Sequence, residues 1–578
     1  MSISKIMSAT VQWSIETFRD QYEKGLLLKP RIQRKKRWDL HKMNKYIGFI
    51  QTYKNAVMPF LISEVILEGV KKYYIFDGNN RSNTILDFYE SPLSFELVAL
   101  PASFSKEMKL KLKTFSLEKL LDRKLTFHKV CREMEIKVED LTNVSTLEDD
   151  WQTMIEDLDA LKFGDIKLDM TIFSHLTTEQ MCHIYESINE GGVKLSKQEL
   201  LASSTSRMLF TKTTLHSFDE LKHLIETQYY EDMNSTEKLK IVEDSKGSLN
   251  LFEVLVAFQY KLHVMYPYCI PEPCSFSKET DLDMVFRLYK YITRMEFDKA
   301  PSPAILNTFL NQIETACKII DTIYTQYFNP NIPCNEIKKY LKVQKNVAIL
   351  LIVYVIDATI HSISLKLIQS NLSRVILYHE LMSTYKEKEG IRTKLSLPPD
   401  FIRYEAGGLF VQNQVQKIQA SHTFEFVPTK EQLEVLLKDR CQEDLEEGVE
   451  KAKRRPLTKA QAIALSVFYG TQIPSIKMKD PQNKDHIVPY STTCSLGPYD
   501  IHRLGNLQLI SESLNKSRGA KPITDAWIEE KGLIYQFYPK ESEYGTICDH
   551  KVIKDLEAYN AMCSSREAKY MELILATL

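Results

Sequence analysis

Four polar residues near the C-terminus have the types and the order that phosphodiester hydrolysis requires. Asp485 and His486 are adjacent, and Asn506 and Asn515 follow within the next thirty positions. Because an imidazole titrates near neutral pH, His486 is a candidate general base that activates water. Asp485 and Asn515 offer oxygen ligands for Mg²⁺ or Mn²⁺, and a hard cation stabilises the charge that develops on the phosphate. We expect Asn506 to hold the loop that carries His486 through an amide-to-backbone hydrogen bond.

Basic side chains follow these residues and could bind the DNA phosphates. Residues 451–521 hold twelve bases against four acids, whereas residues 430–450 hold eight acids against three bases. The acidic stretch is typical of a solvated helix face or a linker. The basic stretch concentrates positive charge beside the candidate site, as phosphate binding requires. The candidate DNA contacts are Lys516, Arg518 and Lys521.

The same segment resembles a known nuclease motif. DHIVP, then Gly-Asn, then a polar residue nine positions later is similar to the His-Asn-His (HNH) motif, with Asn515 in place of the last His. The resemblance implies a ββα-metal fold and DNA endonuclease activity. It makes Asp485 and Asn515 metal ligands, His486 the general base and Asn506 its positioning residue. Taken singly, each of these residues is as well explained by a loop or a turn, and the four in order favour the nuclease.

Two motifs near the N-terminus could bind a phosphate group. They are KPRIQRKKRWD, residues 29–39, and YYIFDGNNRSNTILDFY, residues 73–89. The second predicts a strand, a tight Asp77-Gly78 turn and a helix, whose first backbone amides form a natural phosphate site. Asp77 could bind a cation or orient water, and Arg34 and Arg81 could neutralise phosphate charge. The simpler interpretation is a turn followed by an N-capped helix.

Together these motifs resemble the N-terminal domain of GmrSD-type modification-dependent restriction enzymes. The resemblance implies a ParB/sulfiredoxin-like α/β domain associated with nucleotide hydrolysis, and these enzymes carry an HNH nuclease domain at the C-terminus. The family pattern DGQQR is DGNNR here, so the two amides have a shorter reach. Trp38 and Thr84 also match, as does the later stretch INEGGVKLS at 188–196. The implied nucleotide-binding residues are Gln33, Arg34, Asp77, Gly78, Asn79, Asn80 and Arg81.

The elements that must position these residues divide the chain into three predicted segments. Residues 1–205 mix strands, at 60–65 and 72–76, with a helix at 81–89, and Ser196 with Glu199 predicts a later capping box. Residues 206–450 show helical spacing, chiefly over 282–297, 305–328 and 343–385, with a fully buried helix around 347–356. Residues 451–578 contain the nuclease motif. The predicted fold is therefore α+β, multidomain and predominantly helical.

Composition limits the class of protein. The chain has 578 residues, 44% of them hydrophobic, and a formal net charge of −1. This balance excludes a disordered chain and a polybasic protein that coats nucleic acid wholesale. Ten Cys without a CxxC pair predict free, mostly buried thiols. No apolar run approaches the roughly 20 residues of a membrane span, so we expect a soluble intracellular protein, cytoplasmic, or nuclear or in a viral factory if eukaryotic or viral.

The sequence thus favours a nucleotide-regulated, divalent-metal-dependent DNA endonuclease of the restriction or defence type, acting on modified or foreign DNA. Its cofactors would be Mg²⁺ or Mn²⁺ and a nucleoside triphosphate, GTP or ATP. Its partners would be DNA and a nucleotide, and we expect no association with a membrane. Formation of a homo-oligomer is left open. The alternatives are a nucleotidase and a regulatory DNA-binding protein with a non-catalytic HNH fold.

Overall fold

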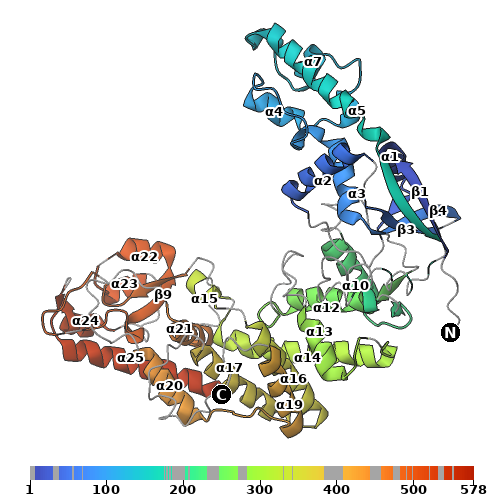
Figure 1. The fold of residues 1–578 in the computed structure, drawn as a ribbon. Coiled ribbons are helices and arrows are strands. Elements are labelled where there is room, and N and C mark those ends of the chain that lie inside the picture. The colour runs from blue at the N-terminus through green and yellow to red at the C-terminus, as the bar shows by residue number, and fades with distance from the viewer. Residues whose placement is uncertain are drawn as a thin grey trace. The chain divides into compact units, whose positions relative to one another are not determined.

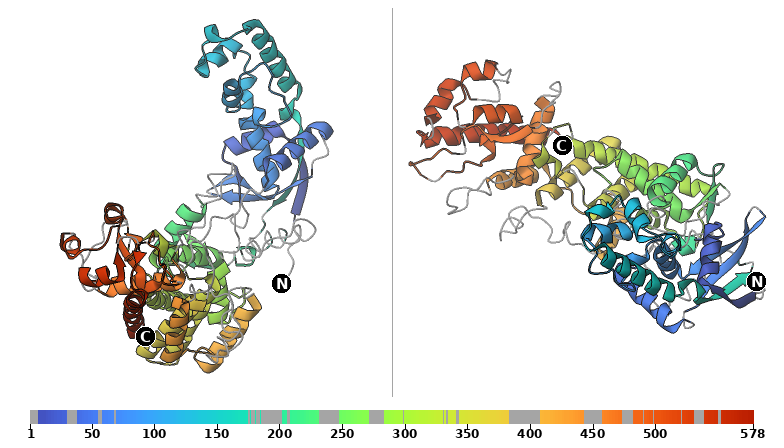
Figure 2. Two further views of the ribbon diagram at one scale, coloured as in Figure 1. Left: turned by 90° about the vertical axis from the view of Figure 1, so that its left-hand side faces the viewer. Right: turned by 90° about the horizontal axis from the view of Figure 1, so that it is seen from above.

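The chain forms two compact units in the computed structural model of Figures 1 and 2. Unit 1 comprises Met1–Tyr260, Cys274–Asp283 and Met295–Leu306, and unit 2 comprises Lys261–Pro273, Met284–Arg294 and Asn307–Leu578. The structure describes residues 7–29, 38–54, 58–67, 69–174, 176, 180, 184, 202–205, 208–230, 247–270, 283–297, 299–329, 331–332, 334–340, 343–382, 408–442, 457–472, 482–489, 491–497, 499–519, 521–530, 539–549 and 552–578.

A mixed β-sheet organises the start of unit 1. The strand order within the described residues is β1-β5-β3-β4-β2, with the β1–β5 and β3–β4 pairs antiparallel and the β3–β5 and β2–β4 pairs parallel. The strands β3 and β4 form a hairpin that ends at the Asp77-Gly78 turn. The strands are β1 (Met7–Ser14), β2 (Leu27–Leu28), β3 (Phe60–Leu67), β4 (Val70–Asp77) and β5 (Lys167–Ser174).

Helices cover this sheet and extend away from it. Figure 1 shows α2 and α3 against the strands, whereas α4, α5 and α7 gather at one end of the unit. One hydrophobic core joins the sheet to these helices and includes Ile62 from the sheet, Phe88 from α3 and Trp151 from α7. The helices are α1 (Ile15–Glu23), α2 (Leu40–Tyr53), α3 (Asn79–Glu90), α4 (Lys106–Leu112), α5 (Leu117–Leu120), α6 (Phe127–Glu133) and α7 (Val144–Ala160).

The later part of unit 1 contains short strands and a short helix. The strands β6 (Leu209–Thr211) and β7 (Ser248–Asn250) pair antiparallel, and the helix α10 (Phe218–Leu224) continues into a π-helical turn, Ile225–Tyr230. The helices α12 (Leu251–Met265) and α14 (Pro303–Tyr327) each cross the division between the two units.

Unit 2 begins as a bundle of helices. Its α16 is buried on every side from Val347 to Ala358, because its apolar residues leave no polar face for solvent. Among the described helices, none combines the length and the hydropathy that crossing a membrane would require. The helices are α13 (Asp283–Thr293), α15 (Asn335–Lys338), α16 (Lys345–Ile360), α17 (Leu365–Met382), α19 (Gly408–Ser421) and α20 (Lys430–Gln442).

The C-terminal part of unit 2 surrounds a short antiparallel strand pair. The strands β8 (Gln482–His486) and β9 (Leu507–Ser511) pair along their whole length, and α22 (Glu512–Arg518) follows β9 directly. A turn of 3₁₀ helix, η6 (Leu504–Asn506), leads into β9 and packs on the long last helix. The other elements are α21 (Lys459–Gln472), α23 (Asp525–Glu530), α24 (Glu541–Ile547), β10 (Cys548–Asp549), β11 (Val552–Ile553) and α25 (Leu556–Ala576).

Several sequence predictions are confirmed and some need correction. The structure is predominantly helical with a small mixed sheet near the N-terminus, and the strands and helix predicted at 60–89 are present. Seven described cysteines are free, and all of these except Cys494 are buried. The stretch 343–385, predicted as helical, contains α16 and α17, which are separated by a turn where Ser362 has a φ of +58°. The predicted strand at Ile487 and Val488 is wrong, since β8 ends one residue earlier at His486.

The predicted helical middle also holds β6 and β7, which sequence spacing did not reveal. The stretch INEGGVKLS at 188–196 and the predicted capping box of Ser196 with Glu199 lie outside the described residues. The three-segment division at residues 205 and 450 remains a proposal.

Candidate functional site

The Asp77-Gly78 turn begins α3 in the way that its sequence suggests. Gly78 has a φ of +108°, a left-handed conformation in which a side chain would be strained. An added Cβ would also lie 2.5 Å from Cδ1 of Phe60, so the ring packs where a side chain would otherwise be. Glycine is therefore required here by both the backbone and its surroundings.

Arg81 connects this turn to the start of β3. Its Nη2 donates to Oδ2 of Asp77 at 2.9 Å and to the carbonyl of Pro59 at 3.1 Å, and its Nη1 donates to the carbonyl of Met58. The guanidinium also lies 4.6 Å from the ring centroid of Phe60. Arg81 thus already binds protein groups, and its most direct role in this structure is to hold the turn.

The two N-terminal motifs meet within unit 1. The side-chain oxygen of Asn80 accepts a hydrogen bond from the backbone amide of Trp38 at 3.3 Å. The side chains of Asn79 and Asn83 are joined at 3.0 Å, one turn apart on α3. The predicted site residues Gln33 and Arg34 lie outside the described residues. Trp38 of the first motif nevertheless lies at the start of α3, although about forty residues separate them in the sequence.

At the other end of the chain, Asp485 lies on β8 directly opposite Gln508 of β9. Gln508 donates from Nε2 to Oδ2 of Asp485 at 2.7 Å, and Arg518 of α22 binds the same oxygen. Both donors bind Oδ2. Within the part of the chain that the structure describes, neither of them occupies Oδ1, which therefore stays available as an acceptor. The carboxylate is largely buried, with 11% of the side chain exposed.

Arg518 joins α22 to the end of β8. Its two terminal nitrogens donate to the backbone carbonyls of His486, at 2.8 Å, and Ile487, at 2.6 Å, in addition to Asp485. Its side chain is 2% exposed. The sequence predicts Arg518 as a DNA contact, but these partners give it a structural role, because a buried guanidinium cannot face a phosphate without leaving them.

His486 is paired with a second histidine that sequence reasoning missed. Nε2 of His486 lies 3.1 Å from Nδ1 of His502, and both residues are buried. The backbone of His502 is held on both sides, by Oδ1 of Asp500 at 2.8 Å and by Nε2 of Gln461 at 2.9 Å. The signal available in the sequence was a second histidine in the same segment, four residues before Asn506.

Asn506 holds the chain that follows His486. Its side-chain oxygen accepts from the amide of Val488 at 2.8 Å, and its Nδ2 donates to the carbonyls of Ile501 at 2.8 Å and Val488 at 3.2 Å. Its own carbonyl accepts from the amide of Ile487. This fully buried amide therefore makes the kind of backbone contact expected from the sequence.

The last helix, α25, supports η6 and the start of β9. Gly505 lies so close to the backbone of Cys563 that an added Cβ would collide with it. Glu567 accepts from the amide of Gly505 at 3.2 Å and binds Arg503 through both of its oxygens, at 2.8 Å each. This support comes from about sixty residues downstream, and sequence reasoning did not find it.

The remaining candidate residues lie on or just after α22. Asn515 is half-buried on this helix, which packs on β8 and β9. Lys516 is exposed and forms a 2.5 Å ion pair with Glu512, one turn earlier. Lys521 is exposed as well. Both lysines can reach a phosphate from solvent, since a surface ion pair costs little to break.

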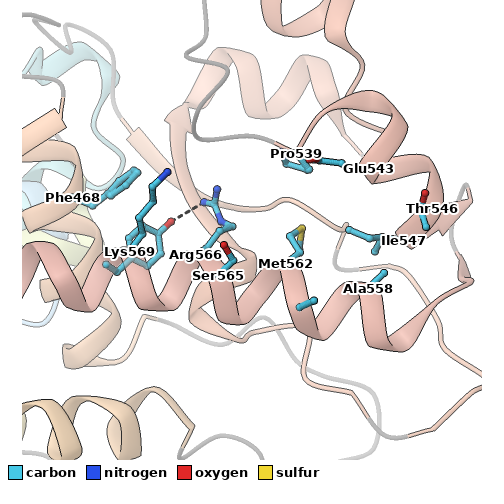
Figure 3. A pocket seen from close by; sticks show the side chains of 12 residues that line it. Phe468, Pro539, Glu543, Thr546, Ile547, Ala558, Met562, Ser565, Arg566 and Lys569 are labelled. Carbon is cyan, nitrogen blue, oxygen red and sulfur yellow. Dashed lines mark hydrogen bonds between the residues drawn. The ribbon is translucent and has the colours of Figure 1, made fainter.

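A separate hollow of about 500 Å³ is lined chiefly by residues of α24 and α25. Figure 3 shows Arg566 and Lys569 on α25 beside Phe468, with Arg566 bonded to Tyr570 at 2.7 Å. Arg566 also donates to the carbonyl of Gly505 at 2.7 Å. Asp485, His486 and Asn506 do not line this hollow, so it is distinct from the predicted nuclease site.

Comparison with known proteins finds a similarity in the N-terminal region. Residues 15–206 match the family model of the GmrSD restriction endonuclease, N-terminal domain. No curated protein matches the chain. The match covers the strand-turn-helix at Asp77–Arg81 and ends before unit 2, so the C-terminal arrangement stands on its own geometry.

Proposed function

We propose that this protein is a nucleotide-regulated, divalent-metal-dependent DNA endonuclease that acts in defence against modified or foreign DNA. The observation that carries the proposal is the β8–β9–α22 arrangement, with His486 at the end of β8 and Asn506 bonded to Val488. The match of residues 15–206 to a restriction endonuclease domain supports the same class of activity. DNA would be its substrate.

The residues around His486 support a role as general base. In this proposal His486 removes a proton from the attacking water, and Nδ1 of His502 orients the ring through the 3.1 Å contact. Asn506 keeps the backbone after His486 in place. Lys516 and Lys521 bind the DNA phosphates.

The donor set fits a hard cation. Asp485 has a carboxylate oxygen that neither Gln508 nor Arg518 uses, and Asn515 adds an amide oxygen from the neighbouring helix. Mg²⁺ or Mn²⁺ held there would stabilise the developing charge on the phosphate.

The test is DNA cleavage by the full chain in Mg²⁺ or Mn²⁺. Replacing a general base removes about 10²–10⁴-fold of the rate, so His486→Ala should lose at least that much. His128→Ala is the matched control, because His128 is an exposed residue of unit 1. Equal cleavage by wild type and His486→Ala would refute the assignment.

A non-catalytic, DNA-binding protein is the second candidate. Asp485 binds Arg518 and His486 binds His502, so both groups have protein partners that a metal or substrate would have to share. DNA binding by the wild type without cleavage under any divalent ion would favour this reading.

For the N-terminal domain we propose nucleotide binding at the start of α3, with GTP or ATP as the ligand. Asp77 remains 38% exposed although it binds Arg81, so its carboxylate can still orient water or a cation. The predicted contacts are Gln33, Arg34 and Asp77 through Arg81.

Phosphate release with and without DNA tests this second site. Asp77→Asn should abolish release, whereas Asp157→Asn, on the exposed face of α7, should not change it. Release that is insensitive to Asp77→Asn would remove the N-terminal site from the proposal and leave the nuclease untouched.

A further inference from the structure

Two helix ends in unit 2 bring three potential metal ligands together, far in sequence from the residues discussed so far. Asp357 and His361 lie one turn apart at the end of α16, and His422 directly follows α19. One ligand atom from each of the three lies within 4.8 Å of the other two. Two imidazoles and a carboxylate are a donor set that suits Zn²⁺.

The distances between these groups are close to those around a four-coordinate ion. Oδ2 of Asp357 lies 2.9 Å from Nδ1 of His422 and 3.7 Å from Nδ1 of His361. Ligand atoms at about 2.0 Å from a tetrahedral ion lie about 3.3 Å apart, a value between these two. Small side-chain rotations would therefore complete the geometry.

The two rings lie against each other, and one of them would turn out of the stack when both bind the same ion. The imidazoles of His361 and His422 are stacked, with centroids 3.5 Å apart and planes 25° apart. Nδ1 of His361 lies 2.8 Å from the backbone carbonyl of Asp357. On binding an ion, the His361 ring would turn so that Nδ1 leaves this carbonyl and faces the metal.

The helix ends add a favourable field. The C-terminal ends of α16 and α19 carry partial negative charge from their last carbonyls, and both point toward this cluster. His422 has a φ of +58° and its amide still bonds to the carbonyl of Ile418, so the ring is held just beyond the helix. The side chains of His361 and His422 are 43% and 38% exposed, which leaves an approach for an ion from solvent.

We propose that Asp357, His361 and His422 form a zinc site that ties the end of α16 to the end of α19. The fourth ligand would be water, because solvent reaches both rings. This site is independent of the proposed nuclease centre, since its ligands come from other elements and its donor set favours a different metal.

Zinc binding to the full chain tests this proposal. After treatment with a chelator, the protein is titrated with ZnCl₂ by calorimetry, and CoCl₂ is used to read the coordination from its visible absorption. The test variants are His361→Gln/His422→Gln and Asp357→Asn. We expect Zn²⁺ affinity to fall more than about tenfold in each, since even outer-shell partners of a metal contribute that much. The intense bands of four-coordinate Co²⁺ should disappear in both.

Two controls separate this site from the others. Asp485→Asn, which alters the proposed nuclease centre, should keep the Zn²⁺ affinity and the Co²⁺ bands, as should His128→Gln. With chelator present, the thermal midpoints of the wild type and the two zinc-site variants should agree, and ZnCl₂ should raise the midpoint of the wild type and of His128→Gln but not those of the zinc-site variants. Equal zinc affinity in wild type and the double variant, or loss of the Co²⁺ bands in Asp485→Asn alone, would overturn the proposal.

Discussion

The candidate sites at the two ends of the chain share one pattern of hydrogen bonds around an arginine. In each, an arginine on the helix after the motif binds an aspartate and two consecutive backbone carbonyls. Arg81 binds Asp77 and the carbonyls of residues 58 and 59, and Arg518 binds Asp485 and the carbonyls of residues 486 and 487. From sequence, both arginines read as phosphate ligands.

The difference between the two lies in exposure. Asp77 is 38% exposed and Arg81 is 10% exposed, whereas the values for Asp485 and Arg518 are 11% and 2%. The N-terminal pair can therefore exchange partners with a ligand at modest cost, because water screens the charges. The C-terminal pair is enclosed, and removing one partner strands a buried charge. Arg518 thus has a structural role inside the protein, whereas Arg81 lies beside a carboxylate that a ligand can still reach.

The largest effect expected from this comparison follows removal of each arginine. Arg518→Met should lower the local free energy of unfolding by about 3–5 kcal/mol, because Asp485 would remain buried and charged. Arg81→Met should cost about 1.5–3 kcal/mol, the range for hydrogen bonds to a charged group. Hydrogen exchange of β8 and β9, compared with β3 and β4, measures both. Arg123→Met, at an exposed position, is the control; equal losses at both sites would remove the distinction.

Replacing a buried asparagine side chain should likewise cost more at the C-terminal site than at the N-terminal one. Asn506→Ala removes three hydrogen bonds and leaves backbone groups of Val488 and Ile501 unpaired, at a cost of about 2–3 kcal/mol. Asn83→Ala removes two hydrogen bonds to Asn79, one turn earlier on the same helix, and should cost about 1 kcal/mol. Exchange of the amides at 486–489 and in α3 reports each loss. A greater loss in α3 would contradict this account of Asn506.

The losses of stability expected from replacing Gly505 and Gly78 differ less between the two sites. Gly505→Ala should destabilise by about 1–3 kcal/mol, because the new methyl group meets the backbone of α25 at Cys563, which cannot rotate away. Gly78→Ala meets the ring of Phe60 and a positive φ, each of which costs about 1–2 kcal/mol. Adding Phe60→Leu should recover part of the Gly78→Ala loss in thermal unfolding. Recovery of Gly505→Ala by truncating the Cys563 side chain would show that the backbone contact is not the cause.

The pH dependence of unfolding should distinguish unit 2, which contains His379, from unit 1. Burial, and then the nearby Lys459, lower the pKa of His379 on α17 from about 6.5 to about 3. The unfolded chain therefore binds a proton that the folded chain excludes, and stability is lost as the pH falls from about 6.5 toward 3. The slope from this residue is at most about 1.4 kcal/mol per pH unit.

Unfolding of unit 2 between pH 7 and pH 4, in wild type and His379→Asn, measures this slope. The variant should show a flatter profile, whereas His128→Gln should match the wild type. Burial raises the pKa of the adjacent Glu380, which acts in the opposite direction and above pH 4.5. Identical profiles for wild type and His379→Asn would show that the histidine does not remain neutral.

The sequence by itself determined the local elements and the residue types at both sites. The strand, Asp-Gly turn and helix at 60–90 follow from short-range patterns, since a glycine with positive φ and a run of apolar residues act within a few positions. Residues 485, 486, 506 and 515 were likewise marked by their order. The fully buried helix α16 was evident from its apolar run.

Only the tertiary structure decided which groups these residues touch. The pairing of His486 with His502, the enclosure of Arg518, and the support of Gly505 by α25 depend on chain segments sixteen to about sixty residues apart. The meeting of Asp357 and His361 with His422 likewise joins helix ends more than sixty residues apart. Hydrogen bonds and charge pairs are set by distance in space and by burial, and neither can be read from spacing along the chain.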